Sequence, residues 1–152
     1  MKKMYFLLIW WLSIATYAQE RSNAYTAVET FFKAFHAKDS LAMKNSFMPQ
    51  ARLMRSVDRN GKAMLEENDL QGFIQAVASR KASPKWEEQL GTPVLQQHQN
   101  LATVWVPFRF YLDNTLSHCG YNAFTLVWDN KQWKILSLID TATKECDQFT
   151  FW

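Results

Sequence analysis

The chain has 152 residues, with 17 lysines and arginines against 14 aspartates and glutamates, and a formal net charge of +3. This length suits one domain with a proper hydrophobic core, and the weak charge, without a basic stripe, excludes nucleic acid as the expected partner. Aromatic residues make up 15% of the chain, which favours a large, well-filled interior or an apolar pocket.

Residues 1–18 have the layout of a secretory signal peptide. Two lysines precede an apolar run from Met4 to Ile14, and small residues near Ala18 offer a cleavage point. A membrane anchor is the alternative, but the run is shorter than the ~20 apolar residues that a spanning helix needs. We therefore expect cleavage near Ala18, one domain over residues 19–152, and a periplasmic or secreted protein without membrane contact after cleavage.

Two helices are expected next. The first is predicted from Ser22 or Asn23 to about Ala37, because its apolar residues recur at helical spacing. Asp39 is a suitable N-cap for a second, short helix, which Pro49 would end. The apolar positions expected for the two helices are Val28, Phe31, Phe32 and Phe35 in the first and Leu41, Ala42 and Phe47 in the second.

The pattern then changes to strands. The segments "ARLMRSV" and "KAMLEE" flank Asn60-Gly61, which predicts a hairpin, and Asn68 or Asp69 can cap a third helix. After Trp86 the sequence reads as four strands: "EEQLGTPVLQQH", "LATVWVPFRFYL", "HCGYNAFTLVW" and "QWKILSLID". This order predicts an α+β domain, in which a curved antiparallel sheet wraps around three N-terminal helices.

Three segments carry a family resemblance. The phrases "FFKAFHAKDSLAMKNSFMPQARL", "DLQGFIQAVASR" and "YNAFTLVWDNKQWKILSLID" resemble the opening, third helix and last hairpin of the nuclear transport factor 2-like superfamily. The exported branches described as SnoaL-like or putative lumazine-binding are the most similar. The resemblance implies a cone-shaped cystatin-like roll, an apolar pocket between sheet and helices, and commonly a homodimer through the outer sheet face. It does not imply one chemistry, because the superfamily includes enzymes, binding proteins and assembly domains.

The resemblance argues against ketosteroid isomerase activity. Aligned on that branch, the tyrosine, the aspartate base and the acidic donor correspond to Phe31, Arg55 and Phe124. Phenylalanine has no proton to give, and arginine cannot act as a base near neutral pH.

Strand alternation indicates which residues face the pocket. Four polar residues would then form a polar cluster at one end: Arg55, His118, Asn122 and Asp140. A carboxylate beside a histidine raises the pKa of the imidazole and can orient it as a base, so His118 and Asp140 are the candidate catalytic pair. A purely structural role for that pair is the alternative. The inward positions expected on the last three strands are Val106, Phe108, Phe110 and Leu112; His118, Gly120, Asn122, Phe124 and Leu126; and Leu136, Leu138, Asp140 and Ala142.

Cys119 and Cys146 are the two cysteines of the chain. In an oxidising compartment such a pair is first interpreted as a disulfide, with two buried thiols as the alternative. His118 and Cys119 would point to opposite faces of a strand, and the three histidines share no metal-ligand spacing, so no metal and no cofactor is expected.

The leading functional hypothesis is an exported protein that binds a small apolar or aromatic molecule, oriented by the polar cluster. The second is an enzyme of the dehydratase, isomerase or cyclase type that uses His118 and Asp140. The third is a homodimeric assembly domain with a filled interior, whose functional surface is the outer sheet face around Trp105, Arg109 and Tyr111. The apolar side chains expected to hold a ligand are Phe31, Phe35, Phe108, Phe110 and Phe124.

Overall fold

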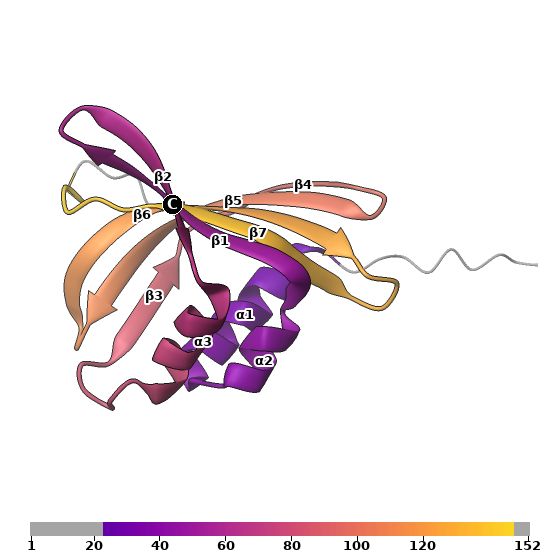
Figure 1. Ribbon diagram of the computed structural model, residues 1–152, viewed down its shortest axis with the longest axis horizontal. Helices are drawn as coiled ribbons and strands as arrows, with labels where there is room; N and C mark the ends of the chain where they lie inside the picture. Colours follow the sequence, from indigo (N-terminus) through magenta and orange to yellow (C-terminus); the bar gives the residue numbers. More distant parts are fainter. Residues whose placement is uncertain (1–22, 148–152) are drawn as a thin grey trace, which may run out of the picture.

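A strongly curved sheet arches over three helices in the computed structural model, which describes residues 23–147 (Figure 1). The predicted signal peptide lies outside the described residues. The helices are α1 (Tyr25–Ala37), α2 (Ser40–Asn45) and α3 (Leu70–Ser79). The strands are β1 (Phe47–Arg59), β2 (Lys62–Asn68), β3 (Trp86–Leu90), β4 (Val94–His98), β5 (Leu101–Leu112), β6 (Thr115–Trp128) and β7 (Trp133–Thr141).

The sheet is mixed rather than wholly antiparallel as expected. Its strand order is β2-β1-β7-β6-β5-β3, and β4 also pairs with β5. All of these pairs are antiparallel except β1 with β7, which run parallel. The first and last strands meet at the centre of the sheet, and local sequence patterns carry no information on such a distant pairing. The curved α+β fold itself is confirmed.

The short second helix differs from its prediction. Asp39 is its N-cap, and the carboxylate accepts a hydrogen bond from the backbone N–H of Ala42 at 2.9 Å. The residue buried from this helix is Met43, whereas Leu41 is 68% exposed. The helix stops at Asn45, and Pro49 therefore lies inside β1 and does not end it.

The turn and cap chemistry of the next segment is confirmed. Asn60 and Gly61 both adopt positive φ angles, 58° and 76°, as the tight turn between β1 and β2 requires. Asp69 caps α3 by accepting from the backbone N–H groups of Gln71 and Gly72.

Two irregularities shape the C-terminal half of the sheet. The first predicted strand after Trp86 is two strands, β3 and β4, which follow one another along the same edge of β5. A bulge between β6 and β7 places Ile135 and Leu138 in the core and leaves Leu136 half-buried, so the inward assignment of Leu136 was wrong. An extra residue reverses the alternation of a strand, and Asp140, beyond the bulge, keeps the expected direction. Ala142 follows the end of β7 and is exposed.

Aromatic rings fill the core between α1 and the sheet. The ring of Phe31 lies 5.0 Å from that of Phe32 and 5.3 Å from that of Phe47, between centroids. Burying one such side chain stabilises the fold by about 1.5–3 kcal/mol. None of the helices within residues 23–147 has the length and apolar character needed to cross a membrane.

A disulfide ties the segment that follows β7 to the outer side of the sheet. Cys119 and Cys146 are bonded, with Cα atoms 5.8 Å apart, and Cys119 is fully buried. Thr143 lies opposite Cys119 and exchanges two backbone hydrogen bonds with it, of 3.0 and 2.8 Å. Cys119 is therefore a structural residue.

Candidate functional site

A cavity of about 870 Å³ lies between the concave face of the sheet and helices α1 and α3. Its walls are mainly apolar and carry several aromatic rings, of which Phe35 and Phe73 stack 6.3 Å apart on the helical side. Four of the five expected ligand-contacting phenylalanines line it: Phe31, Phe35, Phe108 and Phe110. Phe124 belongs instead to the core between α1 and the sheet, where its ring centroid lies 6.5 Å from that of Phe31 and 6.2 Å from that of Phe32.

Arg55 and Asp140 form an ion pair in the cavity wall. They are opposite partners in the parallel pairing of β1 with β7. The Nε of Arg55 donates to both carboxylate oxygens of Asp140, at 2.9 and 3.0 Å, and its Nη2 donates to Oδ2. These hydrogen bonds raise the pKa of Arg55, so the guanidinium stays charged and its charge is matched by Asp140.

Glu88 belongs to the same wall, and the sequence analysis missed it. It lies on β3, and its Oε1 accepts a hydrogen bond of 2.7 Å from Nδ2 of the buried Asn122 on β6. Burial raises the pKa of Glu88 to about 8, with a further contribution from the negative charge of Asp140. One signal was present in the sequence: in "WEEQL", the apolar Trp86 and Leu90 flank Glu88 at the spacing that shares one strand face.

His118 lies beside this group without pairing with Asp140. Its Nδ1 is 3.2 Å from the hydroxyl of Ser117, and its ring stacks on Phe110 with centroids 4.8 Å apart. Burial and the positive charge of Arg55 lower the pKa of His118, although Asp140 opposes this. The expected direct pairing and raised pKa of His118 were therefore wrong, because Arg55 takes up the carboxylate of Asp140.

His36 contributes from outside the cavity wall. It lies in the last turn of α1, and its Nε2 accepts a hydrogen bond of 3.0 Å from the backbone N–H of Glu88. Burial lowers the pKa of His36. A neutral imidazole thus fixes the backbone of β3 to α1 at Glu88.

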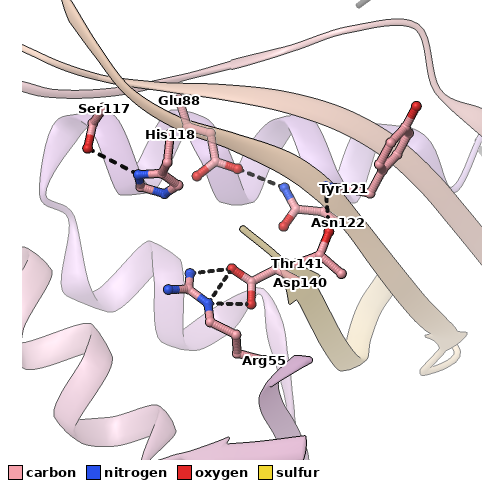
Figure 2. Close-up of polar contacts among 8 residues, drawn as sticks. All are labelled: Arg55, Glu88, Ser117, His118, Tyr121, Asn122, Asp140 and Thr141. Carbon is pink, nitrogen blue, oxygen red and sulfur yellow. Dashed lines mark hydrogen bonds and ion pairs between the residues drawn. The ribbon is translucent and has the colours of Figure 1, made fainter. Parts of the chain in front are cut away.

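The sheet register explains how five polar side chains reach one wall (Figure 2). Arg55, Asp140 and Asn122 lie in one row across β1, β7 and β6. Glu88 and His118 lie in another row, on either side of Phe110 on β5. The four residues of the predicted polar cluster are brought to the cavity, and all four line it together with Glu88.

The polar side of the cavity carries hydrogen-bonding groups but little net charge. With Glu88 protonated and His118 neutral at neutral pH, the wall offers hydrogen-bond groups without net charge, because Arg55 and Asp140 compensate one another. Within residues 23–147, no three histidine, cysteine or acidic side chains are grouped so as to hold a metal ion. The wall is therefore suited to orienting an uncharged or weakly polar molecule.

The comparisons with known proteins agree with this architecture. The chain matches no protein-family model and no curated protein. It is similar to the solved structure of a nuclear transport factor 2-like protein of unknown function from Shewanella baltica, with 19% identity, a TM-score of 0.60, and coverage of 84% of this chain and 97% of that one. It is also similar to a protein of unknown function with a cystatin-like fold from Nostoc punctiforme, with 10% identity, a TM-score of 0.62, and coverage of 80% and 89%.

A third solved structure is a putative scytalone dehydratase from Novosphingobium aromaticivorans, with 8% identity, a TM-score of 0.61, and coverage of 78% of this chain and 80% of that one. At these identities the likeness concerns the fold. Together with the observed sheet and helices, the three likenesses show that this chain has the nuclear transport factor 2-like fold, also called cystatin-like.

Proposed function

We propose that this protein is an exported binding protein for a small, mainly apolar molecule that occupies the cavity under the curved sheet. The single observation that carries the proposal is the cavity of about 870 Å³ with aromatic walls and a few convergent polar groups. Ligand sites in proteins have this character and typically measure about 300–1,000 Å³. A filled interior, as in the assembly-domain hypothesis, is not favoured by this volume.

The walls suggest how such a ligand would lie. Phe35 and Phe73 form an apolar wall on the helical side, which Trp86 of β3 extends by packing against Phe35, and the polar cluster with Glu88 lies on the sheet side. A flat apolar body would pack against the rings, and one polar atom would meet the sheet. Export is proposed from residues 1–18, and N-terminal sequencing of the mature protein would test it by a start near Gln19.

The decisive experiment is native mass spectrometry of the protein purified from its own cell envelope. A bound small molecule is expected. Ala76 is an exposed residue of α3 that lines the cavity, so Ala76→Trp should narrow the opening and abolish the added mass. Gln75→Trp, on an exposed neighbour outside the lining, is the matched control and should retain the ligand. The absence of any ligand, or its retention in Ala76→Trp, would count against the proposal.

An enzyme is the second candidate. It is favoured by the neutral His118 in the cavity and by the fold likeness to a putative dehydratase. Asp140 would then act through Arg55 rather than as the direct partner of His118. Turnover of the co-purified ligand that disappears in both His118→Ala and Asp140→Asn would support catalysis. A ligand that stays unchanged over long incubation would leave the binding function alone.

A homodimer through the outer sheet face remains our proposal for the assembly. Trp105 is 48% exposed there and stacks on Tyr121, with centroids 4.9 Å apart. The neighbouring Val94 and Leu101 are 60% and 52% exposed. Sedimentation of the wild type as a dimer, and of Trp105→Glu as a monomer with an unchanged circular dichroism spectrum, would support this interface. A wild type that sediments as a monomer would exclude it.

A further inference from the structure

We propose that Glu88 is the hydrogen-bond donor that recognises the polar atom of the ligand, so that the cavity selects an uncharged molecule whose apolar body carries an oxygen acceptor such as a ketone. This inference rests on the proposed binding function and adds the chemical class of the ligand. It also assigns a role to Glu88, the half-buried acid that the sequence analysis missed.

The geometry divides the two oxygens of Glu88 between two tasks. Oε1 accepts the hydrogen bond from the Asn122 amide at 2.7 Å, which fixes it as an acceptor. The other carboxyl oxygen points away from Asn122 in Figure 2 and belongs to a residue of the cavity wall. When the acid carries its proton, we place the O–H group on the oxygen that does not accept from Asn122, at the cavity wall that Glu88 lines.

Burial favours the protonated acid, whereas the neighbouring groups act in both directions: Asp140 raises the pKa of Glu88, and Asn122 and Arg55 lower it. From β1 and β7, Arg55 and Asp140 face Glu88, but they bind one another through several hydrogen bonds. From β6, Asn122 and the half-buried His118 face it, and from α1 the ring of His36 binds its backbone N–H. Its hydrogen-bond partner is thus a neutral amide, and burial raises the pKa of Glu88 to about 8.

The same charges define what the cavity rejects. A carboxylate ligand would bring a second negative charge close to Asp140. A pure hydrocarbon would cover the O–H group of Glu88 and leave it without a partner, which costs free energy in an apolar surrounding. A ketone satisfies the donor and adds no charge, so it fits the wall best.

The test uses the mature protein and three matched probes, the β isomers of acetylnaphthalene, ethylnaphthalene and naphthoate. Their dissociation constants are measured by calorimetry at about pH 6 and about pH 10, on either side of the Glu88 titration. At the lower pH the ketone should bind about fivefold to tenfold more tightly than the hydrocarbon, and the naphthoate more weakly than both. At the higher pH the preference of the wild type for the ketone should disappear.

Glu88→Gln supplies the control, because its amide can accept from Asn122 and still donate into the cavity at every pH. The variant should keep the ketone preference at both pH values. A ketone preference of the wild type that persists at the higher pH, or tightest binding of naphthoate, would overturn the inference even if the variant failed to fold. Equal binding of ketone and hydrocarbon, both blocked in Ala76→Trp, would overturn it and leave the binding function standing. Binding of none of the probes would count against both.

Discussion

Asn122 and Glu88 meet across strand β5, with the Asn122 amide donating to the Glu88 carboxyl at 2.7 Å, although 34 residues separate them in the chain. Their strands, β6 and β3, each pair with β5 and not with one another. The contact joins the buried Asn122 to the half-buried Glu88, and both would otherwise face a mainly apolar cavity without this partner. It is the structural feature on which the proposed ligand chemistry depends.

The raised pKa of Glu88 predicts a specific pH dependence of stability. The folded state holds its proton up to about pH 8, whereas the unfolded carboxyl ionises at the ordinary value of 4.5. The unfolded state therefore binds fewer protons between these values, and the free energy of unfolding falls as pH rises from 4.5 to about 8. This contribution is at most about 5 kcal/mol, and exposure to the cavity reduces it.

Urea unfolding of the wild type and Glu88→Gln across this range isolates the contribution. As pH rises, the unfolding free energy of the wild type should fall relative to that of Glu88→Gln. A difference that stays constant with pH would show that Glu88 ionises normally in the folded protein.

Substitutions of the neighbouring ion pair should shift the pKa of Glu88 in opposite directions. Arg55→Met leaves the charge of Asp140 unmatched and should raise this pKa above about 8. Asp140→Asn removes a negative charge and frees Arg55, and should lower it. Following the carbon chemical shift of the Glu88 carboxyl during a pH titration gives its pKa in each variant. A pKa that changes in the same direction in both variants would contradict the described wall.

His36 should make the fold sensitive to mild acid. Its Nε2 must be unprotonated to accept from the Glu88 backbone, and its folded pKa lies below the ordinary value of 6.5. The stability from this contact is complete above 6.5 and is lost as pH falls toward the lowered folded pKa. Losing the hydrogen bond costs at most about 1 kcal/mol, because His36 is exposed and water can replace its partner.

His36→Gln keeps an acceptor at a similar place without titrating, so this variant should lose less stability than the wild type between neutral and mildly acidic pH. Thermal unfolding of both proteins over that range is the measurement. Equal acid sensitivity would assign the effect to other groups, such as His118.

The disulfide should contribute strongly to stability. Cys119 and Cys146 are 27 residues apart, and closing such a loop stabilises a protein by about 3.5 kcal/mol. Reductant should lower the free energy of unfolding of the wild type by roughly this amount. Cys146→Ser should already be less stable and should not respond to reductant. A wild type that is equally stable with and without reductant would argue against the bond.

The sequence predicted the elements of this fold because local chemistry determines them. Asp39 and Asp69 cap helices, Asn60-Gly61 forms a turn, and the phenylalanine stripe of α1 faces the core. It did not predict the parallel pairing of β1 with β7 or the bulge at Leu136, since both depend on partners distant in the chain.

The candidate site was also predictable only in part, because contacts between distant residues could not be predicted from the sequence. Strand alternation brought Arg55, His118, Asn122 and Asp140 to one wall, as predicted. Which of them bind one another was not predictable, because the parallel register places Arg55 opposite Asp140 and so removes the carboxylate from His118. Glu88 was overlooked because a charged residue in a short strand near a sheet edge is ordinarily solvated.

The central claim is that the cavity under the sheet binds a small apolar molecule, and a calorimetric titration with β-ethylnaphthalene tests it independently of Glu88. The account predicts one bound molecule per chain in the wild type and in Gln75→Trp, and loss of binding in Ala76→Trp, which narrows the opening. Absence of binding in the wild type, or equal affinity in all three proteins, would contradict it.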